Sequence, residues 1–456
     1  MTRYKPVTKA RKAYDYLVFK DGDYYKVQDG DSLQIVHKDR NASKAITEAI
    51  NFLTSNRTWK EKIVLKGDIE ISSAIQLPSY TTLEIQGILR QSNPNEDIIR
   101  LVGTASSPVT NVEVFGGKLI GSGNTGTKQT GVYLSHANHN IIRNLDISNL
   151  SYPCFYAVPG SYNIIDQIYA HDSYECGIEF KGASYHNFIS NCKVINMFEG
   201  PEAYEQGYVL DLGSSYNLFV NCYAKNCSDG FGIRTSNCAF NSFVNCETES
   251  VRSTGFAIGG SYNRFISCAS LSSGLHGFDT GGSYLKFLGC VAKGNKNYGF
   301  NIDSSYNQLV DCMALENEHG FVISASENKI ILSRALNNSK SGINLFWSPS
   351  NCIVVFCSSS GNTTNYSITG TNHILKYNQG LVTENSGEAT ITAGNTYVNV
   401  SHGLDITPDI NKIRITPKDN LNGRDYWISD VNSSTFRINI SSSDSVDHTF
   451  GWSYYN

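Results

Sequence analysis

Four charged residues have types and spacings that suit chemistry on a sugar chain. Glu179 and Lys181 stand two positions apart, and Asp211 and Arg234 follow at later turns of a repeating pattern. Two carboxyl groups ~5–10 Å apart can hydrolyse a glycosidic bond, one as proton donor and the other as base or nucleophile. A base beside a cation can instead cleave a uronate by β-elimination. We therefore take these four as candidate catalytic residues, with a glycoside hydrolase and a polysaccharide lyase both open.

A recurrent glycine followed by an apolar residue, as in Gly177-Ile178, predicts where these side chains point. The residue directly after the glycine should face the interior, so the residues two and four after it should share the solvent-facing side of a strand. These outward columns contain the four candidate catalytic residues and three candidate substrate-binding residues: Tyr156, Asp279 and Asp303. The competing interpretation of the four charged residues is a structural ladder of ion pairs in solvent. The competing interpretation of Asp279 and Asp303 is a solvated turn face.

An irregular loop indicates which turns carry the site. The gap from cysteine to the next glycine is 8 or 9 residues in later turns, but it is 15 from Cys192 to Gly207. Departures from a repeat are where such architectures place binding loops. The extra segment, residues 198–206, supplies further candidate substrate-binding residues: Glu199, Glu202, Tyr204 and Glu205.

The elements that must position these residues are short strands in a repeat. A motif of Ser-Tyr-Asn, apolar residues and Cys recurs, as in residues 215–222, 261–268 and 305–312. Its Asn position recurs mostly every 21 to 24 residues, with Asn351 and Asn372 as the last two members. Such a period leaves no room for a helix and predicts coils of parallel β-structure stacked ~4.8 Å apart. Asn side chains at equivalent turns should then form an amide ladder.

The twelve cysteines fit the same repeat. Seven share one repeat position: Cys192, Cys222, Cys246, Cys268, Cys290, Cys312 and Cys357. A small apolar side chain suits a narrow interior column, whereas zinc sites need closely spaced cysteine pairs that the sequence lacks. We expect buried free thiols, no metal and no cofactor.

The two ends of the chain differ from the repeat. Residues 1–60 contain hairpin signals and an amphipathic segment from Ala45 to Leu53, with Asn41 or Ser43 as N-cap, which suits a helix covering the open end. The repeat is expected over 61–380. Residues 383–456 predict a small β-sandwich-like domain with strands at 389–400, 413–416, 426–431 and 435–440.

Composition excludes several classes of function. The net charge is −4 and no basic tract occurs, so nucleic-acid binding is not expected. The sequence contains no run of ~18 apolar residues, so a membrane span is not expected. The first residues lack the apolar core of a secretory signal, yet the rest is typical of an extracellular or virion-surface protein.

Over residues 40–380 the chain resembles the pectate-lyase-like right-handed parallel β-helix superfamily. The block at 14–25 resembles openings of such proteins from archaea and their viruses, and the tail at 394–404, 436–440 and 448–450 is similar to domains that end viral fibres and tailspikes. The resemblance implies an all-β, right-handed parallel β-helix (solenoid) with an N-terminal capping helix and a small C-terminal β-domain.

The resemblance also implies a function. The expected protein is a tailspike-like homotrimer that binds cell-surface polysaccharide and depolymerises it, alongside other virion or surface-layer proteins. A non-catalytic structural or adhesive fibre is the first alternative. A free polysaccharide lyase or epimerase acting on uronates is the second.

Overall fold

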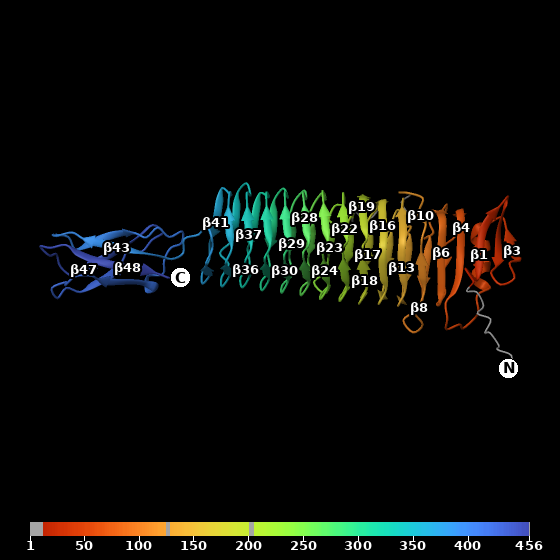
Figure 1. Cartoon of the computed structure of the whole chain (residues 1–456), viewed down its shortest axis with the longest axis horizontal. Coiled ribbons are helices and arrows are strands. Elements are labelled where there is room, and N and C mark those ends of the chain that lie inside the picture. The colour runs from red at the N-terminus through yellow and green to blue at the C-terminus, as the bar shows by residue number, and fades with distance from the viewer. Residues whose placement is uncertain (1–11, 125–127, 200–204, 456) are drawn as a thin grey trace, which may run out of the picture. The chain divides into compact units, whose positions relative to one another are not determined.

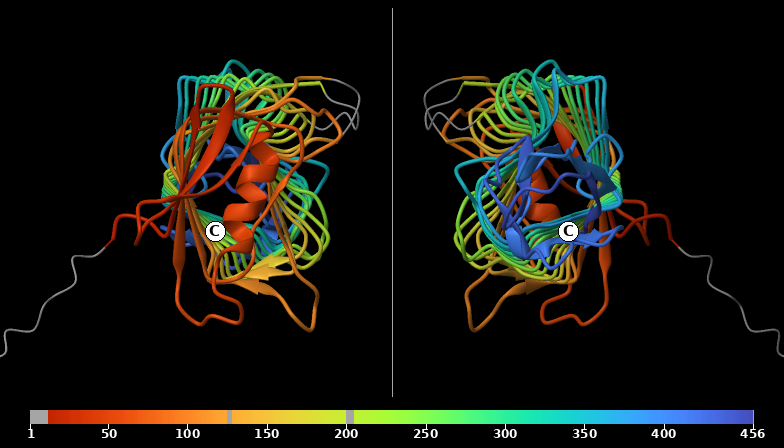
Figure 2. Two further views of the ribbon diagram at one scale, coloured as in Figure 1. Left: turned by 90° about the vertical axis from the view of Figure 1, so that its right-hand side faces the viewer. Right: turned by 90° about the vertical axis from the view of Figure 1, so that its left-hand side faces the viewer.

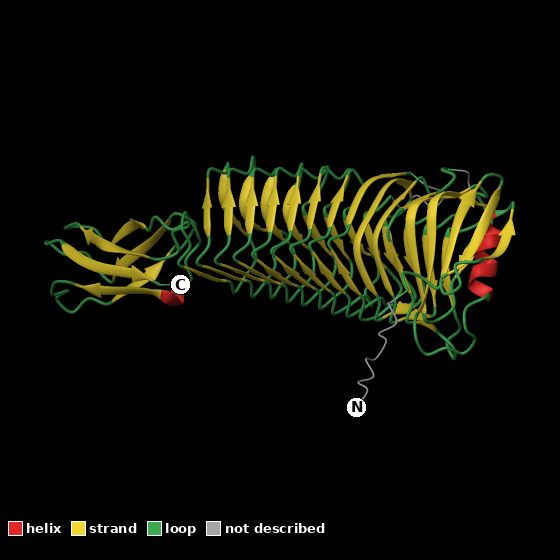
Figure 3. Ribbon diagram, turned by 45° about the vertical axis from the view of Figure 1, so that its right-hand side comes forward, coloured by secondary structure: helices red, strands yellow, loops and turns green. Residues whose placement is uncertain are grey.

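The computed structural model describes residues 12–124, 128–199 and 205–455 and shows an all-β protein built on a parallel β-solenoid of about 13 turns. By its internal contacts the chain divides into two units. The first comprises Met1–Leu285 and Gly294–Lys296, and the second Lys286–Lys293 and Asn297–Asn456. Within each unit the strands of successive coils lie side by side, as Figures 1 and 3 show.

The first unit begins with three strands that pair antiparallel with one another, the first of which also pairs in parallel with β4 (Glu61–Ile71), and with the one α-helix of the described residues. The strands are β1 (Tyr16–Asp21), β2 (Tyr24–Asp29) and β3 (Ile35–Asp39), and the helix is α1 (Ala42–Asn51). Figure 2 shows α1 lying across the end of the first coils. Ala45, Ile46 and Ala49 are buried, so the predicted amphipathic helix is confirmed.

The N-cap of α1 is Asn41. Its side-chain oxygen accepts a hydrogen bond of 3.2 Å from the backbone N–H of Lys44. Ser43, the alternative, lies inside the helix, where its Oγ accepts from the N–H groups of Ser72 and Ser73. The cap therefore satisfies one of the unpaired donors at the helix start, while Ser43 fastens the helix to the first coil.

The coils of the first unit stack their strands in parallel. One stack, called here the site sheet, holds β5 (Ile75–Gln76), β7 (Ile99–Val102), β11 (Val132–Ser135), β14 (Phe155–Ala157), β17 (Ile178–Phe180), β20 (Tyr208–Leu210), β23 (Phe231–Ile233), β26 (Phe256–Ile258) and β29 (Phe278–Thr280). The other large sheet of the coils holds β4 (Glu61–Ile71), β6 (Thr81–Gln91), β9 (Glu113–Phe115), β10 (Lys118–Ile120), β13 (Ile141–Ser148), β16 (Ile164–Tyr174), β18 (Phe188–Ser190), β19 (Lys193–Phe198), β21 (Leu218–Val220), β22 (Tyr223–Lys225), β24 (Ser242–Val244), β25 (Glu247–Glu249), β27 (Arg264–Ile266) and β28 (Ala269–Leu271). A short third sheet holds β8 (Val109–Thr110), β12 (Ala137–Asn138) and β15 (Gly160–Ser161).

The interior of these coils is a stack of aromatic rings. The residue after each motif glycine is buried, as predicted, and the rings of Tyr208, Phe231, Phe256 and Phe278 lie face to face at 4.5, 4.9 and 4.6 Å. Offset stacking adds ~0.5–1.5 kcal/mol per pair to the burial of each ring. All twelve cysteines are buried free thiols, which confirms that expectation.

The amide ladder is also present. From Asn140 to Asn263, each side-chain amide donates to the side-chain oxygen of the equivalent Asn on the next coil, at 3.0–3.1 Å. Asn351 and Asn372, however, are not members, because strand register places Cys352 and His373 at that position. Cys352 stands ten positions after Gly342, whereas Asn328 stands eight after Gly320, so this longer turn carries the ladder position past Asn351.

The second unit continues the same kinds of strand. Its coil strands are β30 (Lys286–Leu288), β31 (Val291–Lys293), β33 (Gln308–Val310), β34 (Met313–Leu315), β36 (Lys329–Ile331), β37 (Arg334–Leu336), β39 (Ile353–Val355), β40 (Ser358–Ser360) and β42 (Ile374–Lys376). A second stack of parallel strands in this unit holds β32 (Tyr298–Ile302), β35 (His319–Ile323), β38 (Ser341–Leu345) and β41 (Thr364–Ile368).

The C-terminal residues form two antiparallel three-stranded sheets. One holds β43 (Asn385–Ile391), β48 (His448–Tyr454) and β45 (Ile413–Pro417), the other β44 (Tyr397–Ser401), β47 (Thr435–Ile440) and β46 (Tyr426–Ser429), with a 3-10 turn, η1 (Ile410–Lys412), before β45. Side chains from both sheets share one core. The stretch 389–400 is thus two strands rather than one, and β48 was not predicted.

Within the described part of the chain, no helix has the length and apolar character needed to cross a membrane.

Candidate functional site

Strand register brings the main candidate residues to neighbouring coils of the site sheet. Tyr156 on β14 pairs with Glu179 on β17, which pairs in turn with Val209 on β20. Asp211 directly follows β20, and its backbone N–H donates to the carbonyl of Phe180 at 2.9 Å. Glu179 and Asp211 therefore lie on adjacent coils, offset by two residues along the strand, as the glycine motif predicts.

Lys181 lies between these two carboxyl groups. Its Nζ is 3.9 Å from Glu179 Oε1 and 3.9 Å from Asp211 Oδ2. Those two oxygens can therefore be no more than about 7.8 Å apart, twice 3.9 Å. This limit lies within the range that glycosidases use for their paired carboxyl groups. We call Glu179, Lys181 and Asp211 the charged cluster.

The cluster is more enclosed than the sequence predicts. Alternation along the strand should point Glu179 and Asp211 to solvent, yet they are only 4% and 9% exposed. That expectation was wrong because it assumed an open strand face. Here Gln206 lies over Gly232, where a Cβ would come within 2.5 Å of the Gln206 Oε1. Carboxyl groups without full access to water are harder to ionise.

Burial raises the pKa of Glu179 to about 7. The cations of Lys181 and Arg234 act in the opposite direction, and the negative charges of Asp211 and Glu175 raise the pKa further. A carboxyl group with a pKa close to neutrality is present in both protonation states at pH 7. Glu179 can therefore give a proton to a reacting group or take one from it.

Arg234 is oriented by a chain of hydrogen bonds. Its Nε donates to Gln206 Oε1 at 3.0 Å, and Gln206 Nε2 donates to Asp229 Oδ2 at 2.7 Å. Asp229 Oδ1 accepts from the backbone N–H of Thr254 at 3.0 Å. Arg234 also approaches Cys176 Sγ at 3.8 Å. These contacts hold the guanidinium near the cluster.

Tyrosines occupy the coils before Glu179. The ring of Tyr156 packs against Tyr133 at 5.8 Å and, edge to face, against Tyr152 at 5.4 Å. Burial raises the pKa of the Tyr156 phenol, and the charge of Glu179 adds to the effect. Tyr156 therefore keeps its proton and suits packing or hydrogen-bond donation to a ligand rather than proton abstraction.

A groove of about 280 Å³ lies on the coils after the cluster. Arg234 and Gln206 line one part of it, and Asp279 lines another. Three glycines on successive coils also line it, Gly232, Gly259 and Gly281, together with Ile233, Ala257 and Ile258. The missing side chains leave room that larger residues on this sheet face would fill.

The remaining candidates do not join this cluster. Glu202 and Tyr204 lie outside the described residues. Glu199 is exposed directly after β19. Glu205 pairs with Arg252 at 2.6 Å. Asp303 belongs to the second unit and accepts hydrogen bonds from Asn301 and Ser324.

Sequence reasoning missed several residues of the site. Gln206 lies in the irregular loop segment, so its proximity could have been inferred, but its hydrogen bond to Arg234 could not. Tyr152 stands in a turn that lies outside the repeated motifs.

In residues 12–124, 128–199 and 205–455, no three His, Cys, Asp or Glu side chains are grouped to hold a metal ion.

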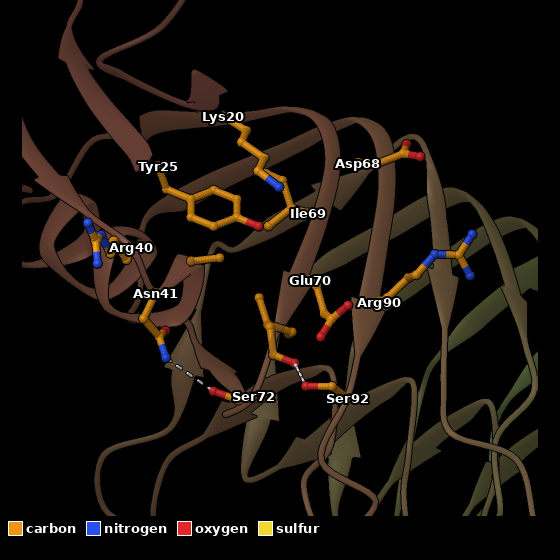
Figure 4. A pocket seen from close by; sticks show the side chains of 12 residues that line it. Lys20, Tyr25, Arg40, Asn41, Asp68, Ile69, Glu70, Ser72, Arg90 and Ser92 are labelled. Atoms are coloured by element: carbon orange, nitrogen blue, oxygen red, sulfur yellow. Dashed lines mark hydrogen bonds between the residues drawn. The ribbon is translucent and has the colours of Figure 1, made fainter. Parts of the chain in front are cut away.

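A second hollow, of about 500 Å³, lies at the N-terminal end of the first unit (Figure 4). Lys20, Arg40, Glu70 and Arg90 line it, together with the ring of Tyr25. Its charged side chains are all exposed to solvent. Such groups keep their ordinary hydration, so this hollow lacks the enclosure that distinguishes the charged cluster.

Comparison with known proteins gives the family. A sequence profile described as "Right handed beta helix region" matches residues 99–270 and 232–359. Among curated protein sequences, none matches the chain. Similar solved structures include the Dettilon tailspike protein (12% identity, covering 92% of this chain and 91% of that chain, TM-score 0.44). They also include a tailspike mutant of E. coli bacteriophage HK620 in complex with a hexasaccharide (9%, 91% and 90%, 0.49).

A third similar structure is the catalytic domain of a GH87 α-1,3-glucanase variant in complex with nigerose. Its identity is 13%, it covers 74% of this chain and 67% of that chain, and its TM-score is 0.50. At this identity the similarity supports the architecture of the solenoid and says nothing of individual residues.

Proposed function

Because the chain belongs to the right-handed β-helix family, we propose that it binds polysaccharide along the site sheet and hydrolyses a glycosidic bond at the charged cluster. The observation that carries this proposal is the enclosed Glu179, whose pKa is raised to about 7 beside a second carboxylate on the next coil. An ion ladder in solvent would not need an acid with such a pKa.

In the proposed reaction, Glu179 is the proton donor. Its proton passes to the glycosidic oxygen as the bond from that oxygen to the anomeric carbon breaks. Asp211 either takes a proton from the attacking water or attacks the anomeric carbon itself. The ammonium group of Lys181, 3.9 Å from both carboxyl groups, offsets the negative charge that Glu179 acquires beside Asp211 when it gives up its proton.

β-Elimination would have to use a base other than the tyrosine of this site. Elimination from a uronate needs a group that removes a proton from carbon, and Tyr156 is a poor one because its pKa is raised. Arg234 could neutralise a uronate carboxylate, so elimination by a lyase or epimerase remains the alternative that the assay must separate.

Binding without cleavage is the other alternative. The Lys181 contacts at 3.9 Å are also compatible with a structural ion ladder. A stiff stack of coils would then serve as an adhesive fibre.

The setting of the protein is also part of the proposal. We place it on a virion or cell surface as a tailspike-like homotrimer, together with other virion or surface-layer proteins. The resemblance of the tail at 394–450 to domains that end viral fibres supports this. Light scattering of the purified full chain tests it, since a trimer has three times the mass of the 50.3 kDa chain.

Depolymerisation of a panel of neutral and acidic polysaccharides tests the activity. Reducing ends and the ultraviolet absorbance of unsaturated uronates are followed together for the wild type, Glu179→Gln, Asp211→Asn and Lys181→Ala. New reducing ends without absorbance, lost in Glu179→Gln and Asp211→Asn, would support hydrolysis. Rising absorbance would point to a lyase. Retained binding with neither signal would point to a fibre.

A matched control is Glu249→Gln. This residue is also a carboxylate beside a lysine, with Lys225 Nζ at 2.7 Å, but it lies on β25 in the other sheet. Its replacement should leave turnover unchanged. A loss of activity as large as that of Glu179→Gln would mean that the assay reports stability rather than chemistry.

A further inference from the structure

Two exposed aromatic rings stand at the end of β38 in the second unit. Phe346 and Trp347 directly follow β38, and their rings stack at 5.2 Å with 29° between the planes. The indole of Trp347 is 77% exposed. We call this pair the aromatic platform. One face of the indole is covered by Phe346, which leaves the other available to a ligand.

The backbone under the platform is held in an unfavourable conformation. Trp347 and Ser348 have φ of 60° and 56°, a region that bulky residues seldom adopt. The N–H of Ser348 donates to Thr369 Oγ1 at 3.1 Å, and this hydroxyl donates to the carbonyl of Leu345 at 2.6 Å. The neighbouring coil thus maintains a turn that displays a large ring.

Hydrogen-bonding groups lie on the coils next to the platform. Register aligns Ile302 on β32, Ile323 on β35 and Leu345 on β38. The residues that follow them, Asp303, Ser324 and Phe346, therefore occupy equivalent positions on successive coils ~4.8 Å apart. Asp303 Oδ1 accepts from Ser324 Oγ at 2.6 Å.

Asn344 adds an acceptor whose partner is missing. Its side-chain oxygen is buried and has no hydrogen-bond partner. Asn344 precedes Phe346 by two residues, so the alternation of a strand places the two on the same face. A buried acceptor without a donor is unfavourable, and a ligand hydroxyl would satisfy it when the Asn344 side chain rotates toward the ligand.

We propose that these groups form a second saccharide-binding site, which holds neutral sugar units and does not cleave them. The apolar face of a sugar ring would pack on Trp347, while a hydroxyl of that ring donates to Asn344 and one of the next sugar unit donates to Asp303. The carboxylate of Asp303 would repel an acidic sugar, so neutral units are the class that fits. The site lacks the paired carboxyl groups of the charged cluster, and it stands whether or not that cluster is catalytic.

Affinity electrophoresis of the full chain tests this proposal. Native gels are cast with dextran, laminarin, glycogen or galactomannan, and with alginate as an acidic comparison. All proteins carry Glu179→Gln, so that the polymer in the gel stays intact. At least one neutral polymer should slow the parent, and Trp347→Ala should raise the apparent Kd roughly tenfold, the effect of losing an aromatic contact.

Three further variants sharpen the test. Trp347→Tyr should restore most of the binding. Trp59→Ala, which removes another exposed tryptophan, should bind like the parent. Asn344→Leu should weaken binding without lowering the thermal midpoint of the free protein, because it removes an unpaired acceptor; a merely structural role would lower that midpoint.

Several outcomes would overturn the proposal. They are unchanged retardation of Trp347→Ala, no retardation in any neutral gel, and a lower mass of Trp347→Ala in light scattering, which would assign the platform to contact with a second copy. The proposed hydrolysis is measured separately by reducing ends, so either inference can fail alone.

Discussion

The carboxyl group of Glu179 lies 3.9 Å from Lys181 Nζ, and yet its pKa is raised to about 7. A nearby cation alone would lower the pKa. The loss of hydration in the enclosed site therefore outweighs the attraction of the ammonium group. This balance makes Glu179 an acid suited to neutral pH, and its effect on stability and turnover can be measured.

Glu179→Gln should stabilise the first unit at pH 8. A carboxyl group whose pKa is higher in the folded than in the unfolded state stabilises the fold below its unfolded pKa, and this contribution is lost as pH rises through about 7. The amide lacks this cost, so the variant should gain up to ~3 kcal/mol at pH 8 and little at pH 4. Urea unfolding at both pH values measures it. Glu249→Gln should show no such gain, because contacts with Lys225 and Tyr223 lower the pKa of Glu249.

Lys181→Met should move the pH dependence of turnover upward. Lys181 lowers the pKa of Glu179, so without this cation the proton donor should stay protonated to higher pH. The alkaline limb of kcat/KM should shift to higher pH, even though the maximal rate falls. Lys181→Arg keeps the charge and should retain the wild-type limb. A shift toward lower pH in Lys181→Met would contradict the assignment of Glu179 as donor.

The C-terminal sheets should lose stability above neutral pH. His448 is buried between Asp419 Oδ1 at 2.8 Å and Asp444 Oδ2 at 3.1 Å, and Arg424 also pairs with Asp444. Hydrogen bonding to Asp419, then to Asp444, raises the pKa of His448. Its contribution is therefore complete below pH 6.5 and declines as pH rises through the folded-state pKa.

Thermal unfolding of the full chain between pH 5.5 and 9 measures this effect. Tryptophan fluorescence follows the unfolding of these sheets, because Trp452 lies in their core. His448→Gln should lower the midpoint at pH 5.5 and flatten its pH dependence. An equally steep dependence in the variant would rule out His448 as the titrating group.

Asn217→Ala should destabilise the first unit by about 3 kcal/mol or more. Asn217 accepts from Asn187 and donates to both Asn241 Oδ1 and the carbonyl of Ser184, so its loss leaves several buried groups unpaired. Chemical denaturation measures the cost. Asn221→Gly, which removes an exposed amide and tolerates the φ of 53°, should cost under ~1 kcal/mol. If both variants lost the same free energy of unfolding, burial of the amide ladder would not contribute to stability.

The period of the repeat predicted that Glu179 and Asp211 would lie on adjacent coils, because strand register follows directly from residue spacing. It could not predict their enclosure, since that depends on Gln206 and Arg234 meeting across coils. The strand β48 was missed although Phe450, Trp452 and Tyr454 alternate as in a strand, because the residues between them are glycine and serine, which have a low preference for strands. Asn351 was assigned to the ladder because sequence spacing cannot show which residues a longer turn absorbs.

The amide ladder begins and ends on the main chain. Asn140 Oδ1 accepts from the N–H of Val112, and the amide of Asn263 donates to the carbonyls of Cys238 and Gly260. Every Asn in between both donates a hydrogen bond to the next side chain and accepts one from the previous side chain. A gene duplication that adds one whole coil between two members would therefore bring its own donor and acceptor and leave both ends intact. Lineages of this protein can thus evolve in length by whole coils, whereas insertion of part of a coil would break the ladder.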